Sequence, residues 1–80
     1  MLHGWRRVDD GLFAAVMKGG DQARYHLVVE RLPNASGWDW TVWRPGDAPD
    51  AARHGVAPSS AEAMRAAERA VGNWGRSAAP

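Results

Sequence analysis

The residues of this chain that could carry out catalysis are few, and their spacing does not suit it. The chain contains no cysteine, so its nucleophiles are hydroxyls, carboxylates and the single lysine, Lys18. Ser59 lies near His54 in the sequence, but it is better placed as a helix cap. Asp9 and Asp10 are adjacent, and on a strand they would point to opposite faces, which disfavours a shared proton. We therefore predict that the protein is not an enzyme.

Metal and cofactor binding also lack a sequence pattern. Asp47, Asp50 and His54 share one polar stretch and offer oxygen and imidazole ligands that can hold a divalent ion. Their spacing matches neither the HExxH nor the EF-hand pattern, and residues of these types are common in polar loops. The Gly19–Gly20 pair is too short to cradle a phosphate. We expect no metal and no cofactor.

The feature that calls for explanation is the surplus of tryptophan, with five in 80 residues and three of them within the stretch GWDWTVW. A domain of this size buries only about 60% of the surface of its unfolded chain. Without disulfides, large aromatic side chains are the best means of compensation, so part of the surplus serves stability. On a strand, however, Trp38 and Trp40 share one face and Trp43 lies on the other.

The predicted contact surface is centred on Trp43, with His26 and Arg44 beside it. A half-exposed tryptophan next to an arginine suits a hot spot for protein binding, and it also suits base stacking. Tryptophan–arginine neighbours recur near both ends of the chain, in WRR and WGR, and would form one aromatic and basic surface if they met. The alternative is that Trp43 packs beneath a loop at residues 45–58 as a second small core. The predicted partner-binding residues are Trp43, His26, Arg44, Trp5 and Arg6.

The elements that must position these residues are three strands, one loop and one helix. Aromatic and β-branched residues predict strands, and the turn sequence PNASG joins two of them into a hairpin. We predict strands near residues 11–17, 23–32 and 38–44, a Pro- and Gly-rich loop at 45–58 and a helix at 59–74. Residues 1–80 form one small domain of the α+β class, a three-stranded antiparallel sheet (β-β-β) with one C-terminal helix packed on one face. Whether residues 5–17 complete the sheet stays open at this point.

The helix has the clearest sequence pattern. Ser59 and Glu62 form an S-x-x-E capping box, in which side chains satisfy the free N–H groups of the first turn. Gly75 is the expected stop. One apolar stripe follows at spacings of three and four: Met64, Ala67, Val71 and Trp74. One helix covers only one face of a sheet, so the other face must point outward.

Two registers are open to the hairpin. The first pairs Val29 with Trp40 but sets Glu30 against Asp39, which is mildly unfavourable. A shift by one residue pairs Arg31 with Asp39 and changes which residues face each other across the two strands. We favour the first, because it buries five large apolar side chains together, and this outweighs one solvated acidic pair. It places on the outward face His26, Val28, Thr41 and Trp43.

Composition limits the class of partner. Ten basic residues against nine acidic ones give a net charge of +1, which does not by itself favour nucleic acid. The first residues lack the apolar core of a signal peptide, and the longest apolar run, Leu12–Met17, is too short to span a membrane. The absence of cysteine fits a reducing cytoplasm, which is the location we predict. The preference for arginine over lysine and the abundance of alanine indicate a bacterial or phage origin.

Two family resemblances point in the same direction. The order YHLVVER, WDWTVW and then an alanine-rich helix resembles the HicB-type antitoxin half-domain, and Gly55, Ser59, Glu62 and Ala63 approximate that family's entry into its helix. This resemblance implies a partial RNase H-like sheet with one helix, and toxin binding. YHLVVER with ARHGVAPSSAEAMRAAERAVGNWG is similar to small phage anti-CRISPR proteins of a type I inhibitor group. Both resemblances imply a compact protein that acts by occupying a surface.

We therefore predict a small non-enzymatic protein-binding module, of the kind that a phage or mobile element uses as an inhibitor. Its expected partner is a protein, and no membrane is involved. A nucleic-acid-binding module that uses tryptophan and arginine is the first alternative, and it predicts affinity that falls steeply with salt. A self-associating structural protein, a homodimer through open sheet faces or edges, is the second.

Overall fold

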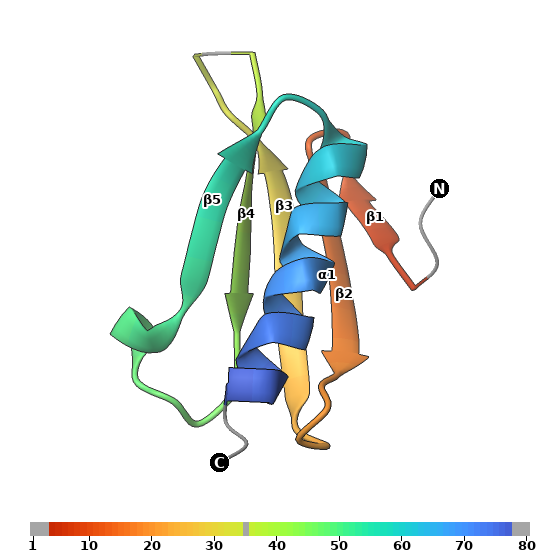
Figure 1. Ribbon diagram of the computed structural model, residues 1–80. Helices are drawn as coiled ribbons and strands as arrows, with labels where there is room; N and C mark the ends of the chain where they lie inside the picture. Colours follow the sequence, from red (N-terminus) through yellow and green to blue (C-terminus); the bar gives the residue numbers. More distant parts are fainter. Residues whose placement is uncertain (1–3, 35, 78–80) are drawn as a thin grey trace.

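The computed structural model describes residues 4–34 and 36–77, with the backbone alone for residues 75–77. The described residues form a five-stranded antiparallel sheet in the order β1-β2-β3-β4-β5, with a helix packed on one face (Figure 1). The elements are β1 (Arg6–Asp9), β2 (Leu12–Lys18), β3 (Arg24–Arg31), β4 (Trp38–Trp43), the 3-10 turn η1 (Pro49–Ala51), β5 (Arg53–Ala57) and α1 (Ser60–Ser77). The α+β class and the C-terminal helix are confirmed. The predicted count of three strands is wrong.

The three predicted strands are β2, β3 and β4, and the two missed strands lie at the edges of the sheet. All four residues of β1 are exposed, so this strand carries no alternation of apolar and polar residues to find. Strand β5 lies within the predicted loop at 45–58. Strand β5 pairs with β4 with Gly55 directly opposite Trp40. The Trp40 indole lies over the Gly55 backbone, and a Cβ atom at Gly55 would be 2.8 Å from Trp40 Cζ2. Glycine in a strand is explained here by a close approach, not by a turn.

The hairpin of β3 and β4 has the favoured register. Val29 is paired with Trp40, and Glu30 is paired with Asp39. Trp38 and Trp40 therefore lie on the face under α1, where both are partly buried against the core. The four fully buried large side chains come from the same face: Tyr25, Leu27, Val29 and Val42.

Helix α1 begins at Ser60, one residue after its cap. The Ser59 hydroxyl oxygen accepts the Glu62 N–H at 3.2 Å, and the hydroxyl lies 3.3 Å from Glu62 Oε2, to which it donates. The helix continues through Gly75 to Ser77, so the predicted stop is wrong. Glycine inside a helix costs only about 1 kcal/mol relative to alanine, and the packing of Trp74 in the same turn outweighs that cost. The predicted stripe is confirmed as buried: Met64, Ala67, Val71 and Trp74.

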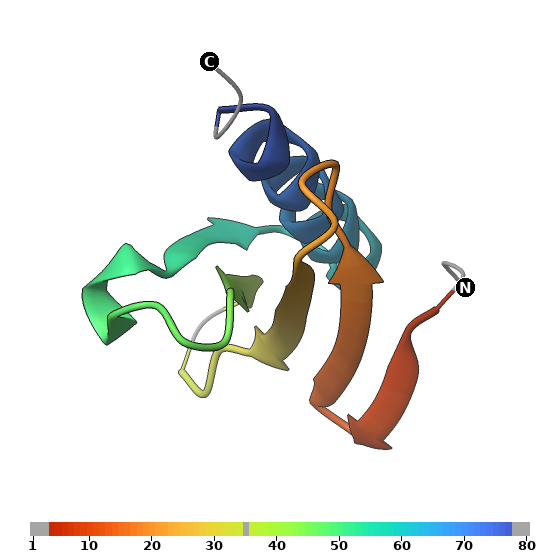
Figure 2. The ribbon, with the colours of Figure 1, turned by 90° about the horizontal axis from the view of Figure 1, so that it is seen from below.

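The described residues place a helix on one side of the sheet only, as the view from below shows (Figure 2). Helix α1 packs against β3, β4 and β5 and leaves the opposite surface of the sheet uncovered (Figure 2). Within the part of the chain that the structure describes, no helix is both long and apolar enough to cross a membrane.

Candidate binding surface

The surface opposite α1 consists of every second residue of the strands, and we call it the open face. Cross-strand pairing aligns these residues in rows that run across the sheet. The open face contains Arg6 and Asp9 from β1; Leu12, Ala14, Val16 and Lys18 from β2; Arg24, His26, Val28 and Glu30 from β3; Asp39, Thr41 and Trp43 from β4; and His54 and Val56 from β5. The predicted outward residues of the hairpin all lie on it.

A stacked aromatic pair lies in one row of the open face. His26 and Trp43 are direct cross-strand partners, and their rings stack with centroids 5.5 Å apart and an interplanar angle of 22°. Trp43 is 37% exposed, so it is not buried as a second core beneath the loop that follows β4. Stacking on a neighbour holds a large apolar side chain in one orientation while one of its faces stays accessible.

A hollow of about 450 Å³ lies beside this pair and spans four strands. Val16, which is 53% exposed, belongs to its lining, while Val56, at 65% exposure, lies farther along the same face beside Asp39. The side chains of the open face that line it are Arg6, Ala14, Val16, His26, Val28 and Trp43. The structure therefore brings together three of the five predicted site residues, and surrounds them with aliphatic groups that the sequence analysis did not assign to the site.

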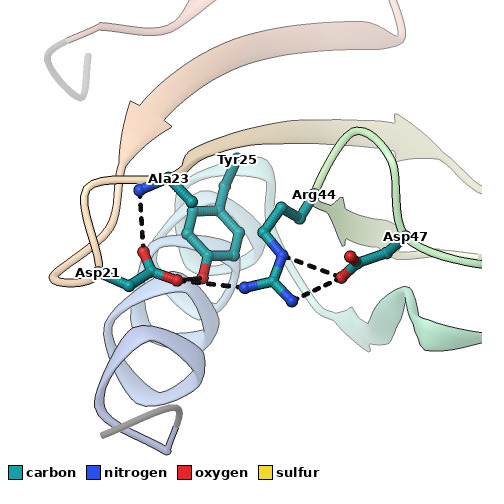
Figure 3. Close-up of polar contacts among 5 residues, drawn as sticks. All are labelled: Asp21, Ala23, Tyr25, Arg44 and Asp47. Carbon is teal, nitrogen blue, oxygen red and sulfur yellow. Dashed lines mark hydrogen bonds and ion pairs between the residues drawn. The ribbon is translucent and has the colours of Figure 1, made fainter.

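Arg44, in contrast, lies on the side of the helix, where it joins two loops (Figure 3). Its Nε donates to Asp47 Oδ2 at 2.9 Å, and its Nη1 donates to Asp21 Oδ2 at 3.2 Å. The guanidinium also lies 5.5 Å from the Trp74 ring centroid, a cation–π distance. The hydrogen bond from Arg44 to Asp47 is the main reason that the pKa of Arg44 is raised. Arg44 therefore links the turn before β3 and the loop after β4 to Trp74 of α1.

The same network fixes Tyr25. Its hydroxyl donates to Asp21 Oδ2 at 2.7 Å, and this hydrogen bond is the main cause that lowers the pKa of Asp21. Burial first, and then the hydrogen bond to Asp21, raises the pKa of Tyr25. Asp21 also accepts the Ala23 N–H at 3.1 Å, which closes the turn between β2 and β3. The network is a structural clamp, and it lies on the side of the sheet away from the stacked pair.

Trp5 is the other predicted site residue that packs on the side of the helix. It is 6% exposed, and its Nε1–H donates to Glu68 Oε2 of α1 at 2.7 Å. Trp74 is buried on α1, so the tryptophans of the three Trp–Arg neighbours do not gather on one surface. The side chain of Arg76 lies outside the described residues. For Trp5 and Arg44 the predicted partner contact stays a prediction, and the structure gives both a packing role.

Basic and acidic side chains lie at opposite ends of the open face, and the sequence analysis did not predict this separation. Lys18 and Arg24 are direct cross-strand partners at one end of β2 and β3. Glu30 and Asp39 are direct partners at the opposite end of β3 and β4. The acidic pair was visible as soon as the hairpin register was chosen. The basic pair required the register between β2 and β3, for which the sequence held no signal.

The described residues contain no group of three or more His, Cys, Asp or Glu side chains that could hold a metal ion. Asp47, one of the three candidate ligands, is bound to Arg44 instead. No protein-family model matches the chain, and neither the curated proteins nor the solved structures contain a match.

Proposed function

We propose that the protein is a small non-enzymatic protein-binding module that occupies a partner's surface with its open face. The observation that carries this proposal is the exposed His26–Trp43 stack beside a hollow lined by aliphatic side chains. An aromatic side chain held rigidly in a concave apolar setting is the typical anchor of a protein interface. An inhibitor of the kind that phages use needs no more than this, because occupying a surface blocks it.

The experiment is an affinity capture from a nuclease-treated bacterial lysate with three baits. One is the wild type, one carries Val16→Ser and Trp43→Ala on the open face, and the matched control carries Arg65→Ala and Arg69→Ala on the exposed side of α1. We expect the wild type and the control to retain the same protein and the open-face variant to lose it. Equal recovery on all three baits would show that the open face is not the binding surface.

Nucleic acid is the second candidate, and one observation favours it. Arg6, Lys18 and Arg24 lie on the same face as the stacked pair, so phosphate contacts and base stacking could act together there. The acidic pair Glu30 and Asp39 at the far end of the face opposes a nucleic acid that follows the strands. This candidate predicts that binding to single-stranded DNA falls steeply between low and moderate salt. Binding that is absent, or insensitive to salt, removes it.

A further inference from the structure

The open face has an apolar centre and oppositely charged ends. The basic pair Lys18 and Arg24 lies at one end and the acidic pair Glu30 and Asp39 at the other. Between them lie two rows that are mainly aliphatic and aromatic, with Arg6 and His54 at their edges: Val16, His26 and Trp43 in one, and Arg6, Ala14, Val28, Thr41 and His54 in the other. Within the described residues, none of the four charged side chains at the ends takes part in an ion pair.

Like charges placed directly opposite each other in a sheet are unfavourable. Two such pairs of opposite sign, at opposite ends of one uncovered face, become favourable when a surface with the reverse arrangement covers them. This face has such an arrangement along β3, because turning it end for end places Glu30 where Arg24 was.

We infer that the occupant of the open face is a second copy of this chain, packed face to face about a two-fold axis that runs across the strands. This inference goes beyond the proposed function, because a second copy on the open face competes with any other partner for the same surface. A two-fold axis in this direction keeps β3 over β3 and reverses the direction along the strand, so Arg24 of each copy faces Glu30 of the other. The apolar rows meet in the middle, as the inner faces of two aligned sheets do.

The size of the face sets the strength of this dimer. The positions of the open face lie about 4.8 Å apart across the strands and about 6.8 Å apart along them, and the short edge strands contribute fewer positions than the inner ones, which gives about 500 Å² on each copy. The total of about 1,000 Å² lies at the lower limit of biological interfaces. We therefore expect a dissociation constant in the micromolar range and a dimer that weakens as salt screens its two ends.

The test is sedimentation velocity over a wide range of protein concentration, with the charge-reversal variants Arg24→Glu and Glu30→Arg. Each variant alone places like charges at both ends of the dimer, and we expect its dissociation constant to rise at least ~10-fold. When the two variants are mixed in equal amounts, each reversed charge meets its opposite, so we expect association to return to the wild-type level. The control, Arg69→Glu on the exposed side of α1, leaves association unchanged.

The outcomes separate this inference from the proposed function. A wild type that stays monomeric at every concentration, or single variants that associate like the wild type, overturns the second copy as the occupant. Failure of the mixture to recover overturns the two-fold arrangement. A monomer that still retains a protein partner through Val16 and Trp43 keeps the proposed function, and one that binds single-stranded DNA in a salt-dependent manner replaces it. Every changed side chain is exposed, so we expect all the variants to fold. Circular dichroism melts check this.

Discussion

Single residues on the helix side of the sheet show how so small a domain is held together without disulfides. Tyr25 contributes a fully buried ring, and its hydroxyl binds Asp21, which in turn accepts from Arg44. The indole of Trp74 lies against the Tyr25 ring at 5.3 Å and under the guanidinium of Arg53 at 4.6 Å. One buried aromatic residue thereby connects a turn, a loop and the end of α1.

The Tyr25–Asp21 hydrogen bond predicts a dependence of stability on pH at both extremes. It lowers the pKa of Asp21 below 3.8, so its contribution to stability is present above that pH and is lost as the pH falls through the lowered value. Burial first, and then this hydrogen bond, raises the pKa of Tyr25 above 10.0, so the contribution of the neutral hydroxyl is present below pH 10 and is lost as the pH rises through the raised value. Tyr25→Phe keeps the ring and should reduce both slopes, as measured by urea unfolding across the pH range. Slopes identical to those of the wild type would show that the hydroxyl does not link the two groups.

The bond between Trp5 and Glu68 gives a second prediction about individual residues. Trp5→Phe keeps a large ring but removes the indole donor, and a hydrogen bond to a carboxylate contributes about 1.5–3 kcal/mol to the free energy of unfolding. We expect Trp5→Phe and Glu68→Ala to cost similar amounts, and the double variant to cost no more than the larger single loss. Additive losses in this double-mutant cycle, measured by urea unfolding, would mean that the two side chains do not act as a pair.

At the scale of elements, the packing of Trp40 on β5 leaves no space for one additional carbon atom at Gly55. Gly55→Ala places a Cβ atom 2.8 Å from Trp40 Cζ2, and the indole or the strand must move. We expect a loss of about 1–3 kcal/mol, the usual cost of overpacking, in thermal or urea unfolding. Gly20→Ala is the matched control, because nothing lies within 4 Å of the added Cβ, and it should leave stability almost unchanged. Equal effects of the two substitutions would contradict the close packing of Gly55.

The elements that could be predicted are those whose sequence reflects burial on one face. Strands β3 and β4 and the stripe of α1 carry period-2 or period-3.6 patterns, so their position and the hairpin register followed from the residues. Strand β2 is a continuous apolar run, and it was predicted from the turn residues on either side of it. The edge strands could not be found in this way. Strand β1 has four exposed residues, and β5 pairs through a glycine whose space is filled by a tryptophan from the neighbouring strand. A contact between distant residues carries no local pattern.

The candidate site was predictable only in part, for the same reason. Alternation along β4 placed Trp43 on the outward face, and the hairpin register placed His26 beside it. Arg44 and Trp5 were chosen because they stand next to tryptophan or arginine in the sequence. Adjacent residues on a strand point to opposite faces, so this choice carried Arg44 to the helix side, where two aspartates hold it.

At the scale of the whole molecule, the division of the tryptophans between the two faces predicts two different outcomes for the same substitution. Trp40 packs against the core under α1 and over Gly55, so Trp40→Ala leaves a cavity and should cost about 2–4 kcal/mol. A domain of this size has only about 5 kcal/mol of total stability, so this variant should keep about 1–3 kcal/mol and melt well below the wild type. Trp43→Ala removes a partly exposed ring that contacts chiefly His26, and should cost about 1 kcal/mol or less.

The measurement is urea unfolding of both variants at a protein concentration low enough to keep the chain monomeric, so that association adds nothing to stability. Trp43→Ala should then remain folded, with the hydrogen-exchange protection of the wild type, while it loses the capacity to bind through the open face. A folded variant that no longer binds would identify Trp43 as a binding residue, in contrast to Trp40, which stabilises the core. If Trp43→Ala instead destabilises the domain as much as Trp40→Ala, Trp43 belongs to a second core and the open face is not a binding surface.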